Sequence, residues 1–188
     1  MGRGFDSHGA YKMTFPLKTE RTIIRPLGLN DLDFFVAYRK DPEIARFQSW
    51  DTSYSLEQAT DLANSQLGIE HPAKDQWLQL AICNQETNQL IGDLALHTLE
   101  DEGCFEIGFT ISREWQGKGF AKEAATKLLD YLFEEVGAKQ IIATTDSRNT
   151  PSIRLMEALG FRQKPEKTWD EEFKEEHVSV FFFELNRD

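Results

Sequence analysis

The chain has 188 residues, of which 40% are hydrophobic, and a formal net charge of −11 at pH 7. This length suits a single domain with a sizeable core. The acidic charge makes nucleic acid an unfavourable direct partner, because binding to phosphates needs a basic face.

Signals for export, membrane insertion and metal binding are missing from the sequence. No apolar run approaches the roughly 20 residues that span a bilayer, and the first residues hold no signal-peptide core. The two cysteines, Cys83 and Cys104, are too few for a disulfide framework and lack the spacing of zinc ligands. We therefore expect a cytoplasmic protein that contacts no membrane and holds no metal.

The first half of the chain is predicted to form strands and helices in the order strand, helix, helix and three-stranded meander. These elements are expected over residues 20–27, 29–41, 55–68, 77–83, 89–100 and 104–111. Residues 1–14 are predicted to be a loose leader and 15–188 a single domain. Asn30 is the expected N-cap of the first helix, and Ser55 with Gln58 fits a capping box at the second.

The second half is predicted to alternate helices and strands. These elements are expected over residues 120–136, 138–146, 151–160, 161–165 and 177–185. Thr150 is the expected N-cap of the short helix, and the acidic stretch 166–177 is predicted to be a loop between the last two strands. The order predicts an α+β fold, with a mixed, mostly antiparallel sheet of six to seven strands and about four helices on its faces.

A glycine loop stands directly before the longest predicted helix. Gly117 and Gly119 precede Phe120, where the helical stripe begins. A helix N-terminus carries unpaired N–H groups and a partial positive charge, and glycines let an anion approach the backbone closely. The loop therefore has the form of a phosphate cradle, although an ordinary strand-to-helix turn remains an alternative.

Known phosphate-binding patterns differ in how well they fit this loop. The Walker pattern is absent, and a dinucleotide-binding pattern would need Gly or Ala at the place of Lys122. A third pattern, Q/R-x-x-G-x-G/A, is satisfied by Gln116, Gly119 and Ala121. A nucleotide-dependent oxidoreductase, with Asp146 as its ribose-binding acid, is a weaker alternative.

The stretches "EIGFTISREWQGKGFAKEA" and "DSRNTPSIRLMEALGF" together resemble the GNAT superfamily of acyl-CoA N-acyltransferases. The branch with the greatest resemblance contains the ribosomal-protein N-terminal acetyltransferases, also called RimJ/RimL-like. The order of elements matches over 20–185. The resemblance implies a GNAT fold and acetyl-CoA as co-substrate, and it is specific for fold and cofactor but weak for the acceptor.

The resemblance also implies which residues hold coenzyme A. Its pyrophosphate would lie on Gln116, Gly117, Lys118, Gly119, Phe120 and Ala121. Its pantetheine arm would pair, like an added strand, with the backbone of Phe109, Thr110 and Ile111. Asn149 would bind the same arm.

Two catalytic residues are implied in the same way. Ser152 would face the thiol, and Glu106 would be the general base, with His97 and His177 as weaker candidates. Many family members carry a tyrosine acid four residues after the serine, but here Met156 stands there and has no proton to give. Ser152 or solvent must then protonate the thiolate.

The implied reaction is transfer of an acetyl group to a primary amine by direct attack in a ternary complex. The acceptor is a peptide or protein N-terminus or a small amine. Trp50, Trp77, Trp169 and the acidic stretch are candidates for its pocket. A non-catalytic acyl-CoA-binding regulatory module is the alternative, and the oligomeric state is expected to be a monomer or a homodimer.

Overall fold

The computed structural model describes residues 13–69 and 72–187. Its strands are β1 (Leu17–Lys18), β2 (Thr22–Pro26), β3 (Gln76–Asn84), β4 (Leu90–Thr98), β5 (Cys104–Ile111), β6 (Gln140–Asp146), β7 (Arg162–Gln163), β8 (Trp169–Phe173) and β9 (Glu176–Asn186). Its α-helices are α1 (Leu32–Arg39), α2 (Pro42–Ala45), α3 (Leu56–Ser65), α4 (Phe120–Tyr131) and α5 (Thr150–Ala158). Most of the predicted leader lies outside the described residues.

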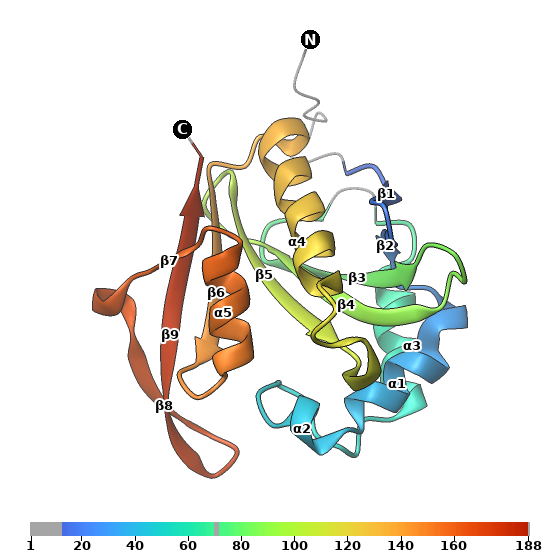
Figure 1. The fold of residues 1–188 in the computed structure, drawn as a ribbon, viewed down its shortest axis with the longest axis horizontal. Coiled ribbons are helices and arrows are strands. Elements are labelled where there is room, and N and C mark those ends of the chain that lie inside the picture. The colour runs from blue at the N-terminus through green and yellow to red at the C-terminus, as the bar shows by residue number, and fades with distance from the viewer. Residues whose placement is uncertain (1–12, 70–71, 188) are drawn as a thin grey trace.

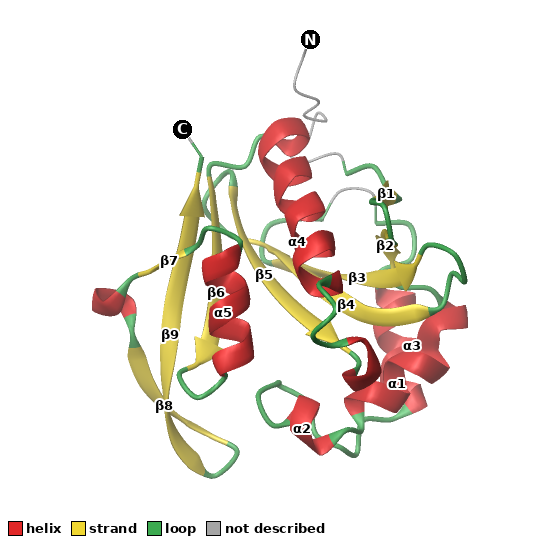
Figure 2. Cartoon of the chain, in the orientation of Figure 1, coloured by secondary structure: helices red, strands yellow, loops and turns green. Residues whose placement is uncertain are grey.

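The strands form one mixed sheet in the order β1-β2-β3-β4-β5-β6-β9-β7, and β8 pairs with β9 (Figure 1). All pairs are antiparallel except β5 with β6. Helix α4 packs on one face through a core that includes Leu128, and α1 with α3 packs on the other through a core that includes Phe35 (Figure 2). The predicted α+β class and mostly antiparallel sheet are confirmed.

Some local predictions were wrong. The N-cap of α1 is Asp31 and not Asn30, because a 3₁₀ turn over Leu29–Asp31 precedes the helix. The N-cap of α5 is Asn149 and not Thr150, since the Asn149 side chain accepts from the Ser152 backbone N–H at 3.4 Å. The capping box of Ser55 and Gln58 is confirmed.

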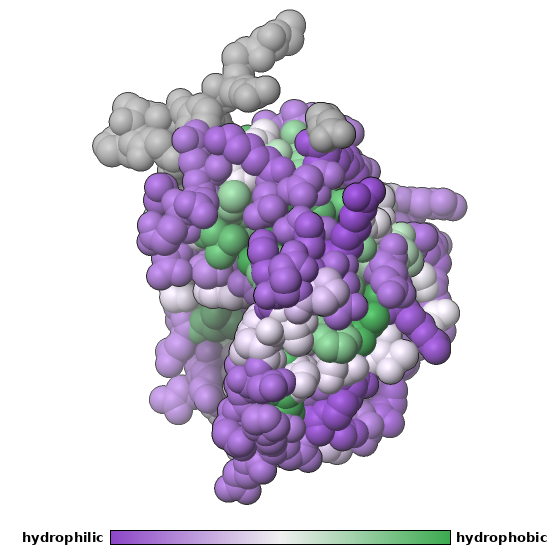
Figure 3. Space-filling view, turned by 90° about the vertical axis from the view of Figure 1, so that its left-hand side faces the viewer, coloured by the Kyte–Doolittle hydropathy of each residue, from purple (hydrophilic) through white to green (hydrophobic). Residues whose placement is uncertain are grey.

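The acidic stretch is also not a loop. It contains a 3₁₀ turn and β8, an edge strand whose residues Trp169 to Glu172 are exposed. Charged side chains on an edge strand discourage further pairing with other chains. The side of the molecule that carries β7 and the β8–β9 hairpin is accordingly mostly hydrophilic (Figure 3).

The parallel pair of β5 and β6 is short. Its register runs only from Cys104 opposite Gln140 to Glu106 opposite Ile142. Past Glu106 the two strands run apart (Figure 1), while β5 stays paired with β4 and β6 with β9. The divergence opens the centre of the sheet.

Among the described residues, no helix is long and apolar enough to cross a membrane. The cytoplasmic location stays a prediction.

A charged contact ties the start of α4 to the first strands. The Glu123 carboxylate accepts from the backbone N–H of Arg21 at 2.8 Å and from its Nε at 2.6 Å, and Thr19 Oγ1 donates to it at 2.5 Å. Arg21 Nη1 also reaches the carbonyl oxygen of Lys118 in the glycine loop, at 3.1 Å. Burial raises the pKa of Glu123, but these donors outweigh it and hold the pKa below its usual value of 4.5.

Replacing this carboxylate should cost stability in a pH-dependent way. A group with a lowered folded-state pKa stabilises the fold above its unfolded pKa, and this contribution is lost as the pH falls through the folded value. We expect Glu123→Gln to lose about 1–2 kcal/mol at pH 7, or roughly 2–8 °C in Tm. Thermal unfolding at a series of pH values should show the gap to wild type closing below about pH 4.5. The exposed Glu135→Gln is the control and should change little; a gap that widens in acid would contradict this account.

Candidate functional site

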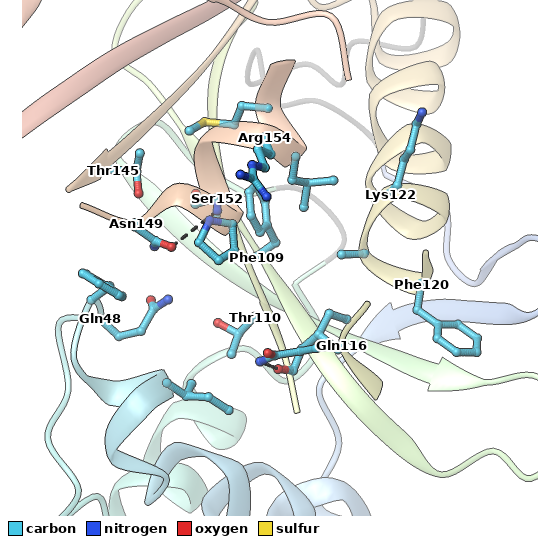
Figure 4. Close-up of a pocket in the computed structure, with 18 of the residues that line it drawn as sticks. Gln48, Phe109, Thr110, Gln116, Phe120, Lys122, Thr145, Asn149, Ser152 and Arg154 are labelled. Carbon is cyan, nitrogen blue, oxygen red and sulfur yellow. Dashed lines mark hydrogen bonds between the residues drawn. The ribbon is translucent and has the colours of Figure 1, made fainter. Parts of the chain in front are cut away.

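A cavity of about 800 Å³ lies where β5 and β6 run apart. Its walls come from β5, β6, the glycine loop, the starts of α4 and α5, and the segment that contains α2 (Figure 4). The structure brings most of the predicted site residues together here. Those that line the cavity are Phe109, Thr110, Ile111, Gln116, Gly117, Gly119, Phe120, Ala121, Asn149 and Ser152.

Both glycines of the loop have backbone conformations that favour glycine. Gly117 has φ 71° and Gly119, the N-cap residue of α4, has φ 82°. Within the described residues, the backbone N–H groups of 117–121 have no hydrogen-bond acceptor. These donors lie at the positive end of the α4 dipole, so the loop can accept an anionic group.

The edge of β5 that faces the opening has peptide groups that are not paired with another strand. Ser112 N–H donates to Ile91 O at 2.9 Å, so alternate β5 residues, Thr110 included, direct their peptide groups toward β4. The peptide groups of Phe109 and Ile111 therefore face the opening. Gln116 Nε2 already donates to Ile111 O at 2.9 Å, which fixes the loop against the strand end. An extended amide chain can pair at Phe109, while Thr110 offers its side chain.

The start of α5 carries two polar groups and a sulfur on one face. Asn149 Oδ1 is used in capping the helix, so its amide NH2 is the part that can donate to a ligand. Ser152 is one turn before Met156, and both line the cavity. Met156 is 1% exposed, and the place that a tyrosine would take is filled by its side chain.

Two cations flank the cavity mouth. Lys122 on α4 and Arg154 on α5 are both exposed and both line the cavity (Figure 4). Lys118 does not line it, and its ammonium lies 5.4 Å from the centre of the Trp115 ring. The mouth thus suits a ligand with several phosphates, and the glycine loop suits its pyrophosphate.

Glu106 stands at the point where β5 and β6 separate, just outside the cavity lining. Thr144, which does line the cavity, donates through Oγ1 to Glu106 Oε1 at 3.2 Å. The other oxygen lies 3.5 Å from His97 Nδ1, and His97 Nε2 lies 2.9 Å from Asp75 Oδ1. Two of the predicted bases are therefore neighbours, and Thr144 connects the Glu106 carboxylate to the cavity.

Several weaker candidates lie elsewhere. His177 is exposed on the C-terminal hairpin, 3.1 Å from Glu172. Trp77 stacks on His97, Trp169 lies on β8, and Trp50 packs on Arg39. Among the described residues none of these lines the cavity, whereas Trp115 does.

Sequence reasoning missed one wall of the cavity. Glu43, Ile44, Phe47 and Gln48 line it from α2 and the turn that follows. This segment is short and has neither a clear apolar period nor a recognisable motif. Its only local signal is the Asp41–Pro42 pair, where Asp41 caps a helix that starts with proline.

Within the described residues, no group of three or more His, Cys, Asp or Glu side chains could hold a metal ion. That the protein works without metal stays a prediction.

Comparison with known proteins agrees with this geometry. A family model described as an acetyltransferase (GNAT) domain matches residues 21–162. The chain is 33% identical over 172 residues to the uncharacterized N-acetyltransferase p20 of Bacillus licheniformis, in a match that covers 90% of this chain and 94% of that protein.

Solved structures share the fold. A GNAT-family acetyltransferase from Bacillus anthracis has a TM-score of 0.79 at 26% identity and covers 92% of this chain and 98% of its own. A putative ribosomal-protein-serine acetyltransferase from Vibrio cholerae has a TM-score of 0.75 with the same coverage of both chains, and at 19% identity it shows the fold alone. The family model and the match to p20 together show that the chain belongs to the GNAT family of acetyl-CoA-dependent N-acetyltransferases.

Proposed function

We propose that this enzyme acetylates the primary amine of a peptide or protein N-terminus, or of a small amine, by direct attack in a ternary complex. The proposal places it in the RimJ/RimL-like branch. The observation that carries it is the single cavity that joins an anion-binding loop, an open strand edge and a wall of α2 residues.

The phosphate end is assigned to the glycine loop and its two flanking cations. The backbone N–H groups of residues 117–121 hold the pyrophosphate, and Lys122 and Arg154 neutralise further phosphate charge. The open peptide groups at Phe109 and the Asn149 amide hold the pantetheine arm. When bound, acetyl-CoA supplies the thioester whose C–S bond is broken.

The acceptor amine must lose a proton before or as it attacks. An α-amine titrates near 7.7–8.0, so roughly a tenth is neutral at pH 7, against about one in 10³ of lysine side chains. We assign Glu106 as the base, acting through Thr144 or a water, because its carboxylate does not line the cavity. An indirect base of this kind suits an α-amine better than a lysine.

Proton return to the sulfur falls to Ser152 or to solvent. As the new C–N bond forms and the C–S bond breaks, the leaving thiolate needs a proton. Met156 is buried in the wall and has none to give. Ser152 lies one turn away on the same face of α5 and carries a hydroxyl that can donate.

The acceptor end of the cavity favours an acceptor with one positive charge. Ile44 and Phe47 give it an apolar wall, and Gln48 gives it a neutral polar group. Of the described residues that line the cavity, Glu43 is the only carboxylate. A polyamine would gain from several carboxylates, whereas a peptide N-terminus needs few. The similar Vibrio cholerae protein is described as a putative ribosomal-protein-serine acetyltransferase, which agrees with a peptide acceptor.

A methyl group added to the glycine loop should block the cofactor. A Cβ at Gly117 would meet no protein atom within 4 Å, so Gly117→Ala mainly pays for its positive φ, about 1 kcal/mol. Acetyl-CoA at about 100 times Kd should raise the wild-type Tm by roughly 5–10 °C, and Gly117→Ala should lose most of that rise. Gly68→Ala is the matched control, because Gly68 has φ 76°, a Cβ there would meet nothing within 4 Å, and the residue lies in the turn after α3, which ends at Ser65. An undiminished rise in Gly117→Ala would remove the loop from the cofactor site.

The role of Glu106 is testable with an isosteric change. Glu106→Gln keeps an oxygen to accept from Thr144 but cannot take a proton, so we expect kcat to fall about 10²-fold. The Tm rise with acetyl-CoA should stay as in wild type. Thiol release should be followed from pH 6 to 9 with peptides that carry a free N-terminus. Glu102→Gln, in the exposed turn before β5, is the control; an unchanged pH–rate profile in Glu106→Gln would reject the base assignment.

A further inference from the structure

The tip of the C-terminal hairpin reaches the acceptor wall. Strands β8 and β9 are joined by a turn in which Lys174 and Glu175 lie between the paired residues Phe173 and Glu176. The Lys174 ammonium donates to Ala45 O at 2.8 Å and to Trp50 O at 2.6 Å, and it lies 3.1 Å from Asp51 Oδ1. One side chain therefore bridges the two ends of the segment 45–50.

The bridged segment is the missed wall of the cavity. Phe47 and Gln48, which line the cavity, stand between the two carbonyl groups that Lys174 binds. Within the segment Gln48 N–H donates to Ala45 O at 3.0 Å, and Trp50 Nε1 donates outward to Arg39 O at 3.2 Å. Ammonium–carbonyl hydrogen bonds are charge-assisted, so Lys174 is a strong constraint on this stretch.

The turn itself is unusual for its sequence. Lys174 has φ 52° and Glu175 has φ 63°, so both residues of this two-residue hairpin loop are left-handed. Such turns favour Asn-Gly, because the Cβ atom of most residues is crowded against the backbone in the left-handed conformation. A lysine is unfavourable at the first position of such a turn, but here its ammonium group contacts the wall of the cavity. Residues held in such conformations often have a functional reason.

The same tip is also tied to the cofactor side. Arg148, the residue before Asn149, donates to Glu176 Oε2 at 2.5 Å and pairs with Asp146 at 2.7 Å. In Figure 1 the hairpin tip and α2 lie together at the lower end of the molecule. The hairpin tip thus connects the loop before α5 with the segment 45–50.

We propose that Lys174 is a positioning residue for the acceptor, which acts by holding Phe47 and Gln48 in the cavity wall. The proposal rests on the proposed function in so far as the wall contacts the acceptor. Lys174 does not itself line the cavity, so its loss should leave cofactor binding intact. The expected signature is a weaker apparent affinity for the acceptor with unchanged affinity for acetyl-CoA.

Amide hydrogen exchange of the full chain tests the constraint without any acceptor. In Lys174→Met, which keeps the length but removes the charge, the amides of Arg46 and Gln48, which donate to Pro42 O and Ala45 O, should exchange about tenfold faster than in wild type. Lys174→Arg should restore most of the protection, because a guanidinium can donate to both carbonyls. Lys164→Met is the matched control: this lysine, just after β7, pairs with Glu184 at 2.7 Å and should leave these amides unchanged. Wild-type exchange in Lys174→Met would overturn the proposal.

A double variant separates the side chain from the turn. Lys174→Asn with Glu175→Gly gives the turn its favoured residues, so the hairpin should be at least as stable as in wild type. The amides of Arg46 and Gln48 should still exchange faster, because the ammonium is gone. If this variant regains wild-type exchange, the turn and not Lys174 holds the wall, and the proposal fails.

Kinetics then test the effect on the acceptor. With a serine-initiated peptide and with spermidine as probes, Lys174→Met should raise the acceptor KM about tenfold, while the KM for acetyl-CoA and its Tm rise stay constant. Equal changes in both KM values, or a fall in kcat alone, would contradict a positioning role. If wild type releases no thiol with either probe, the proposed acceptor class fails, and the exchange data alone decide the role of Lys174.

Discussion

The site depends on one constraint in the sheet: β5 and β6 are paired for three residues and then separate. Each strand stays paired on its other side, β5 with β4 and β6 with β9, so both strands remain part of the sheet after they separate. It leaves peptide groups of β5 without a neighbour in the middle of the sheet. Buried peptide groups need partners, and an extended ligand can supply them. Residues from both faces of the sheet can line the gap. One cavity is therefore lined by five helices and strands and by the loops beside them.

The glycine loop is held in place by charges outside the cavity. Glu123 faces Thr19 and Arg21 in the turn between β1 and β2, and Arg21 in turn binds the Lys118 carbonyl. These contacts occupy the carboxylate of Glu123 and the carbonyl group of Lys118, while the backbone N–H groups of 117–121 stay without an acceptor in the described part of the chain. The loop can therefore keep its donors unpaired without collapsing onto its own carbonyl groups. An anion meets a ready arrangement and little order has to be created on binding.

The sequence predicted those parts of the fold and site that depend on local patterns. The strand Cys104–Ile111, the capping box at Ser55 and the glycine loop before α4 each have a period or a motif of their own. It failed where distant contacts decide the outcome. The acidic stretch became a strand because β9 offers it a partner, and the α2 wall was missed because contacts from far along the chain, from Arg113 and Lys174, help to fix it. The contact of His97 with Glu106 likewise needed the β4–β5 register.

The acceptor wall has the weakest signal in the local sequence, and charged groups add to the burial of Ile44 in holding it in place. Arg113 binds Asp41 at 2.5 Å at the start of α2, Lys174 binds the carbonyls at its end, and behind it Arg39 lies between the Phe35 and Trp50 rings. Arg39 also lies 3.7 Å from Asp93, whose pKa is raised by burial even though Arg39 opposes the shift. Asp93 is opposite Thr110 in the β4–β5 pair, so the buried ionic group supports the cavity from behind. The residues that line such a wall can differ while the cations that support it stay the same. The choice of acceptor is then independent of the glycine loop and the other residues that bind the cofactor.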